Sequence, residues 1–297
     1  MTQPRVPLLM APALGPALGL AVSLAVSFAI LASSPPASAA KGLVVPKAEP
    51  SAAPAASSSP STAASWNDFN ARPLTLPAGM LELHGDFVAN ISSGNGGKPI
   101  WLTPNIGYGA TDDLTLVLAT NPQAEFLPIG GGLCLGTEQY CGHLFNSISP
   151  NVLLSLVRTP GVGIAVHAGV DYNFSPSLVG VRAGALLKVV LPAALSLAAD
   201  PTVFVAVTKR NTLVDDQILL VPIRLGFQAA ELVNVGVVSG VNGPLSSRFS
   251  KGYSVPVGVG AWFAATPSLD LGANLTFVDV RAGADGRTVA LSANYRL

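Results

Sequence analysis

The chain has 297 residues, and its 16 Lys and Arg balance 16 Asp and Glu, so the formal net charge is zero. Nothing in this balance points to nucleic acid or to a generally charged partner, and we expect no nucleic-acid partner. Only 11% of the residues are charged, 49% are hydrophobic and the mean hydropathy is +0.51, which indicates a membrane protein rather than a soluble domain.

The N-terminal region has the pattern of a signal peptide. Arg5 precedes an uncharged apolar block from Leu18 to Ala32, and the following Ala37–Ala39 fits an A-x-A-like cleavage site. We therefore predict a signal peptide over residues 1–39 that is cleaved near Ala39 on export. An uncleaved membrane anchor is the alternative.

A linker is predicted after the signal peptide. Residues 48–65 read AEPSAAPAASSSPSTAAS and offer almost nothing to bury. We therefore predict a disordered periplasmic linker over residues 40–71 and one domain over residues 72–297.

The predicted domain contains no clean candidate for a helix that spans a membrane. Such a helix needs about 20 consecutive apolar residues, and the best stretch, residues 178–199, is interrupted by Arg182, Lys188 and Pro192.

Instead, the polarity of the domain alternates in blocks of about 9 to 14 residues separated by turn residues. In the first block, Leu83 and Phe87 share one face while His84 and Asp86 share the other, as a period of two requires in a strand. We predict about twelve strands, within a range of about 10 to 14. They cover residues 80–91, 100–110, 114–121, 147–158, 162–173, 178–190, 195–208, 217–228, 233–242, 253–265, 269–280 and 287–297.

The connections between these blocks alternate in length. Short ones lie at residues 111–113, 159–161, 191–194, 229–232 and 266–268, and most of the others are longer and polar. Short periplasmic turns and longer outer loops are typical of transmembrane barrels. We therefore predict an all-β fold, a single up-and-down antiparallel transmembrane β-barrel in a bacterial outer membrane.

The last predicted strand, which ends in ANYRL, resembles the C-terminal strand of Gram-negative outer-membrane β-barrel proteins. The hairpin NIGYGATDDLTL at residues 105–116 is similar to repeating units of uncharacterised members. The resemblance covers about residues 72–297 and implies a porin-like or transporter-type barrel, with outer-membrane lipid and the barrel-insertion machinery as partners. Leu297 departs from the Phe that usually ends such chains. A soluble lipocalin-like barrel and a helical membrane protein are the alternatives.

Charged side chains of both signs are predicted to face the lumen. One interpretation is a pore whose charges set the preference for an ion or a small-molecule solute. The other is an internal network of salt bridges that closes the barrel. The lumen candidates are Glu82, His84, Asp86, His167, Asp171, Arg182, Lys188, Asp200, Arg224, Asp270 and Arg296. Many further lumen positions, including Gly180 and Gly184, are glycines that leave space or relieve crowding.

Cys134 and Cys141 lie close together in the longest predicted outer loop, residues 122–146. In an exported protein this spacing predicts a disulfide that stiffens the loop. A metal site with Glu138 and His143 is the alternative, and we predict neither a metal nor a cofactor.

The function predicted from these features is a channel or transport protein that passes small solutes through a narrow lumen. A closed barrel that acts as a structural or surface-binding module is the second hypothesis. A lipid-acting enzyme is the third, and it would need His84 or His167 beside an accessible Ser. The sequence has no Gly-x-Ser-x-Gly motif, so we do not expect an enzyme.

Overall fold

The computed structural model describes residues 66–92, 99–120, 132–135, 141, 144–174, 177–208, 216–246, 249–282 and 286–297. The predicted signal peptide and the predicted linker up to residue 65 lie outside the described residues. Strands cover most of the described chain. They are β1 (Leu81–Asn90), β2 (Ile100–Gly109), β3 (Leu114–Ala119), β4 (Leu133–Leu135), β5 (Ser147–Arg158), β6 (Val162–Phe174), β7 (Ser177–Leu191), β8 (Leu195–Ala199), β9 (Thr202–Ala206), β10 (Gln217–Ala230), β11 (Val233–Pro244), β12 (Val257–Thr266), β13 (Leu269–Phe277) and β14 (Arg287–Arg296).

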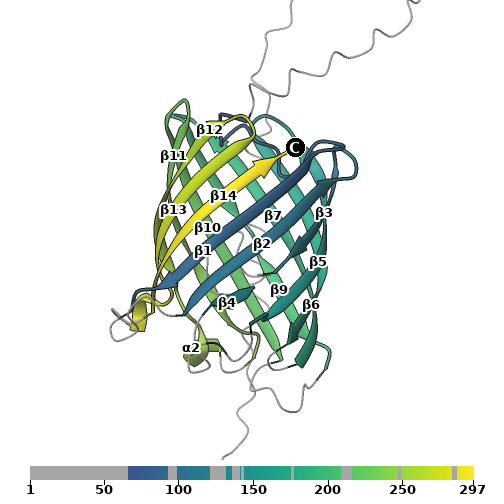
Figure 1. The fold of residues 1–297 in the computed structure, drawn as a ribbon, viewed down its shortest axis with the longest axis vertical. Coiled ribbons are helices and arrows are strands. Elements are labelled where there is room, and N and C mark those ends of the chain that lie inside the picture. The colour runs from purple at the N-terminus through teal and green to yellow at the C-terminus, as the bar shows by residue number, and fades with distance from the viewer. Residues whose placement is uncertain are drawn as a thin grey trace, which may run out of the picture. The chain divides into compact units, whose positions relative to one another are not determined.

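The strands form one antiparallel sheet that closes on itself, because β1 pairs with β14 as well as with β2. β8 and β9 share one place in the wall, since each pairs with both β7 and β10. β4 pairs with β2 beyond the end of β3. The described strands therefore fill twelve wall positions in chain order, which confirms the predicted all-β, up-and-down barrel (Figure 1).

Two local features differ from the predicted strands. The predicted strand over residues 195–208 is interrupted between β8 and β9, where Pro201 has no N–H to donate to a neighbouring strand. The strand predicted to begin at Tyr253 begins at Val257 instead, because Phe249–Gly252 forms the short helix α2 and Pro256 follows it.

The outer surface of the barrel is apolar. In β14, Leu291 and Tyr295 are 56% and 44% exposed, whereas the alternate residues Ala290 and Arg296 are buried. The same alternation leaves large apolar side chains exposed along the other strands, among them Leu83, Phe87, Leu154, Val170, Val181, Leu225, Val237, Val259 and Leu271. A lipid bilayer requires such an exterior, because its hydrocarbon core solvates no polar group.

The two rims of the barrel differ. The turns β2–β3, β5–β6, β7–β8, β10–β11 and β12–β13 and the C-terminus lie at one rim, which we call the short-turn rim (Figure 1). The helix α2 and the 3-10 turn Val280–Ala282 lie at the opposite rim. Among the described residues, no helix is long and apolar enough to cross a membrane.

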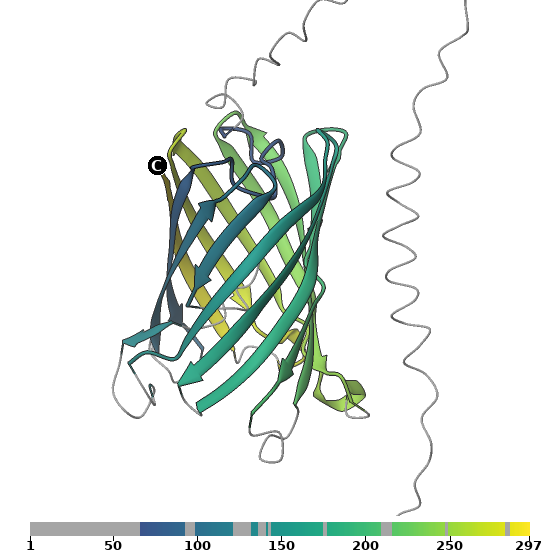
Figure 2. The same cartoon turned by 90° about the vertical axis from the view of Figure 1, so that its right-hand side faces the viewer.

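Residues Trp66–Gly79, which we call the N-terminal segment, precede β1 and form no strand. Figure 2 shows this dark-blue part of the chain coiled among the hairpins of the short-turn rim. Trp66, Phe69 and Asn70, at the end of the predicted linker, line the lumen cavity. The N–H of Phe69 donates to Gln228 of β10, and the Asn70 amide donates to the carbonyl of Ala194 in the β7–β8 turn.

Candidate lumen site

The barrel encloses a cavity of about 430 Å³. Nine of the predicted lumen residues line it: Glu82, His84, His167, Arg182, Lys188, Asp200, Arg224, Asp270 and Arg296. The other two, Asp86 and Asp171, are buried against these residues, with 4% and 2% of their surfaces exposed. The inward register predicted from the alternation thus brings the charges together.

An ionic chain runs across β13, β14 and β1. The carboxylate of Asp270 accepts hydrogen bonds from both terminal nitrogens of Arg72, each at 2.7 Å, and from Arg296. Arg296 also donates through Nε to Glu82 at 2.9 Å. One carboxylate therefore holds two guanidinium groups, and one of them comes from the N-terminal segment.

His84 belongs to a second cluster on the same side of the lumen. Its Nε2 lies 3.0 Å from Asp86 Oδ2, and its Nδ1 lies 3.2 Å from Asn294 Oδ1. Thr103 donates to the same Asp86 oxygen at 3.1 Å. The imidazole is thus held between a carboxylate and an amide.

The remaining pairs lie on β5 to β9. Arg182 Nε donates to Asn151 Oδ1 at 2.7 Å and lies 3.4 Å from Asp171. His167 Nε2 lies 2.7 Å from Asp200 Oδ1, which also accepts a hydrogen bond from a threonine hydroxyl in β9. Both predicted histidines are therefore partners of carboxylates.

Lys188 and Arg224 form a different kind of pair. Both face Ala198 across the strands, so their side chains point to the same face in one cross-strand row. The Lys188 ammonium donates to main-chain carbonyls of the N-terminal segment, while Arg224 donates to Asn234 and stacks 3.8 Å from the Trp262 ring. Among the described residues, no carboxylate lies within ion-pair distance of either cation.

The charges are distributed unevenly around the wall. Glu82, Asp86 and Asp270 lie on β13 and β1, which flank β14. Lys188 and Arg224 lie on β7 and β10, which flank the β8/β9 position. The closed strand order separates β14 from β7 by equal arcs in both directions, so these two groups of side chains lie on opposite sides of the lumen. We call the two sides the acidic wall and the basic wall, although Arg296 also lies on the first and Asp200 on the second.

Glycines of the inner face make room for these side chains. A Cβ added to Gly184 would lie 2.5 Å from His167 Nε2 and 2.5 Å from Thr202 Oγ1. A Cβ added to Gly180 would lie 2.1 Å from the ring of Phe204. These positions are filled by neighbouring side chains and do not widen the lumen.

The sequence prediction missed Arg72 and the aromatic side chains that hold it. Its guanidinium lies 3.7 Å from the Phe69 ring, and Arg296 stacks 4.5 Å from the Trp66 ring. Burial lowers the pKa of Arg72 from its ordinary value, and the neighbouring Asp270 carboxylate opposes that shift. The available signal was the return of large apolar residues, Trp66 and Phe69, directly after the Pro/Ala/Ser-rich stretch.

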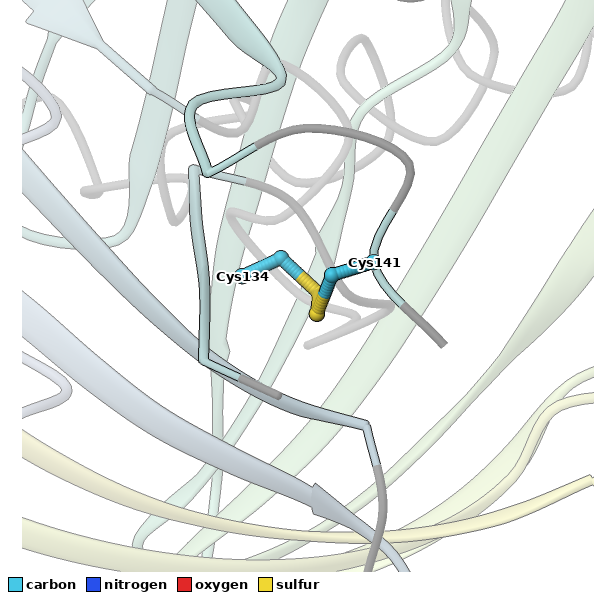
Figure 3. The surroundings of a disulfide bond; sticks show 2 residues. All are labelled: Cys134 and Cys141. Carbon is cyan, nitrogen blue, oxygen red and sulfur yellow. A yellow bond between two sulfur atoms is a disulfide. The ribbon is translucent and has the colours of Figure 1, made fainter. Parts of the chain in front are cut away.

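The predicted disulfide between Cys134 and Cys141 is present (Figure 3). Their Cα atoms are 5.7 Å apart, a usual separation for a bridged pair. It joins β4 to Cys141, seven residues further along the chain. Glu138 and His143, the other ligands of the alternative metal site, lie outside the described residues, and no group of three potential metal ligands occurs within them.

No protein-family model matches the sequence, and neither does any curated protein. Solved structures of porins do match the fold. The NanC porin aligns with a TM-score of 0.53 at 9% identity, over 73% of this chain and 100% of that one. The chain has a porin-like β-barrel fold. The KdgM porin aligns with a TM-score of 0.50 at 7% identity, over 72% of this chain and 98% of the porin.

Proposed function

We propose that this porin-like barrel is a channel of the bacterial outer membrane that passes small polar solutes. The observation that carries this proposal is the contrast between its two surfaces. The exterior is apolar, while charged groups of both signs line an internal cavity of about 430 Å³. Charged side chains that line a pore set solute preference in channels.

The preferred solutes are small anions. Lys188 and Arg224 lie in one row of the basic wall, and neither has a carboxylate partner among the described residues. On the acidic wall, Arg296 neutralises part of the charge of Asp270 and Glu82. The five lumen carboxylates balance the five cations Arg72, Arg182, Lys188, Arg224 and Arg296, so the attraction for negative charge is local to the row of Lys188 and Arg224.

Conductance of the purified protein in planar lipid bilayers tests the channel function. We expect discrete conductance steps and a reversal potential in a KCl gradient that indicates preference for chloride. Because the N-terminal segment lies in the lumen, the same measurement is made on a variant without residues 66–76. A correctly folded barrel that shows no conductance in either form would contradict the channel function.

A closed structural or surface-binding barrel is the second candidate. It is favoured by the ion pairs of Asp270, which join the N-terminal segment to the wall, and by the disulfide-braced residues at Cys134 and Cys141. This candidate predicts unchanged permeability of cells that lack the protein. In either case we expect the barrel to contact outer-membrane lipid and to need the barrel-insertion machinery.

A further inference from the structure

We propose that the N-terminal segment is a releasable plug that closes the lumen at the short-turn rim. This inference rests on the proposed channel function, because a plug matters only where solute would otherwise pass. It concerns a part of the chain that precedes the barrel wall and is not needed to close it, since β1 pairs with β14 directly.

The plug spans the lumen from the acidic wall to the basic wall. At one side, Arg72 is bound to Asp270 through both terminal nitrogens. At the other side, Lys188 donates to the carbonyl oxygens of Phe69 and Arg72 at 3.0 and 2.8 Å. The guanidinium of Arg72 thus binds the acidic wall, and main-chain carbonyl oxygens of the segment bind the basic wall.

Apolar contacts fill the space beside these polar ones. Leu74 packs against the buried side chains of Leu153, Ala165 and Leu186, which come from β5, β6 and β7. Together with the contacts to β7 and β13, this places the segment against several sides of the wall. The segment thus occupies part of the cross-section of the lumen and narrows the path for solute while it stays in place.

The bonding of the segment differs from that of the wall. Among the described residues, no backbone-to-backbone hydrogen bond joins Trp66–Ala78 to the barrel strands. Its polar contacts to the wall each use at least one side chain, as in the bonds of Leu76 N–H to Thr115 and of Thr75 to Asp112. Such contacts can break without disturbing the strand ladders, which are continuous around the barrel.

A hinge lies where the segment joins the wall. Gly79 has φ of +81°, a left-handed conformation that glycine adopts without strain, and its N–H donates to Gly109 at 2.7 Å. Pro77 precedes it and reduces the number of conformations that the segment can take. The turn at Gly79 therefore defines where the segment would leave the lumen while β1 stays paired.

A disulfide trap tests the release of the plug. A Cβ at Gly163 would lie 3.1 Å from Leu74 Cγ, so the double variant Leu74→Cys with Gly163→Cys has side chains close enough to bridge. We expect channel openings of the oxidised variant to fall at least about tenfold below those of the reduced variant, because the bridge holds the plug in the closed state. The controls are the two single variants and the wild type with the same reductant, which also reaches the Cys134–Cys141 bond.

A charge variant tests what holds the plug. Arg72→Gln removes the ion pair with Asp270, and we expect the fraction of time spent open to rise roughly tenfold. Arg158→Gln removes one exposed positive charge at the same rim and is the matched control. The native fold of each variant is checked by its heat-dependent shift in gel mobility.

The outcomes separate the plug from the channel. Equal conductance of the oxidised and reduced trap, with the bridge verified by mass spectrometry, would overturn the plug while leaving the channel function intact. The same holds if Arg72→Gln and the variant without residues 66–76 both conduct as the wild type does. If neither the wild type nor the shortened variant conducts although both are folded, the channel function fails and the plug proposal fails with it.

Discussion

Asp270 is the residue on which the ionic contacts of the lumen converge. Its carboxylate is 5% exposed and accepts hydrogen bonds from Arg72 and Arg296. A buried cation that loses its carboxylate partner still carries the free-energy cost of its removal from water. Removal of one partner therefore destabilises the fold even where the intact ion pair adds little to stability. Arg296 keeps Glu82 as a second partner, whereas Arg72 has Asp270 as its ion-pair partner among the described residues.

Replacement of Asp270 by Ala should therefore lower the free energy of unfolding by about 2 to 4 kcal/mol, because Arg296 of the wall stays buried without that carboxylate and Arg72 loses its ion-pair partner. Urea unfolding of the protein in lipid vesicles measures the change. Glu231→Gln, at an exposed turn of the short-turn rim, is the control and should change the value by less than about 0.5 kcal/mol. Equal effects of the two variants would contradict this assignment.

Lys188 and Arg224, the cations of the basic wall, should determine the preference of the channel for anions over cations. The double variant Lys188→Gln with Arg224→Gln removes two positive charges from one cross-strand row. We expect the preference for chloride over potassium to fall by about tenfold or to reverse, because the acidic wall then dominates the field. Reversal potentials measured on the form without residues 66–76 test this, with Arg158→Gln as the control. An unchanged reversal potential would show that residues other than Lys188 and Arg224 set the ion preference.

At the scale of the strand elements, inner-face glycines let neighbouring strands place large side chains in the lumen. Gly184 of β7 lies between His167 of β6 and Thr202 of β9 in the cross-strand pairing. The absent side chain at Gly184 is what lets His167 reach Asp200. The contact between His167 and Asp200 thus depends on three adjacent strands and on a glycine between them that leaves room for it.

We therefore expect Gly184→Val to destabilise the barrel by about 1 to 3 kcal/mol, because the new side chain must displace His167 and Thr202. Gly85→Val is the control for a glycine with open space around it, since a Cβ added there, on the outer face of β1, meets nothing within 4 Å. The measurement is urea unfolding of both variants in the same vesicles. A similar stability of the two variants would show that the inner face has more free space than the described side chains leave.

At the scale of the whole molecule, the barrel turns its apolar side chains outward, which is the reverse of a soluble barrel. Leu291 in the middle of β14 is 56% exposed, and Leu156 near the end of β5 is 58% exposed. Similar exposure at different heights of the wall makes them a matched pair for testing whether a bilayer surrounds the barrel.

Leu291→Arg should cost about 2 to 4 kcal/mol and Leu156→Arg only about 0 to 1 kcal/mol, since the cost of a cation facing lipid falls from the bilayer midplane to the interface. Unfolding in vesicles gives both values. A soluble barrel would tolerate both substitutions equally, because water reaches both positions. That result would contradict the membrane-spanning orientation.

The sequence by itself determined most of the strands and the direction in which their side chains point. Successive side chains of a strand point to opposite faces, so alternating polarity assigns each residue to a face. It placed His84, Lys188 and Arg296 on the inner face and Leu291 on the outer one. It also predicted the Cys134–Cys141 bond from proximity and export. These properties depend on residues close together in the chain.

Only the tertiary structure decided which inward charges are partners, because pairing depends on the order and register of strands far apart in the sequence. Asp270 and Arg72 are separated by 198 residues, and no local pattern links them. The position of the N-terminal segment was likewise beyond the sequence. It lacks a strand periodicity, and its place is fixed by shape and charge complementarity with a lumen that exists only once the barrel has closed.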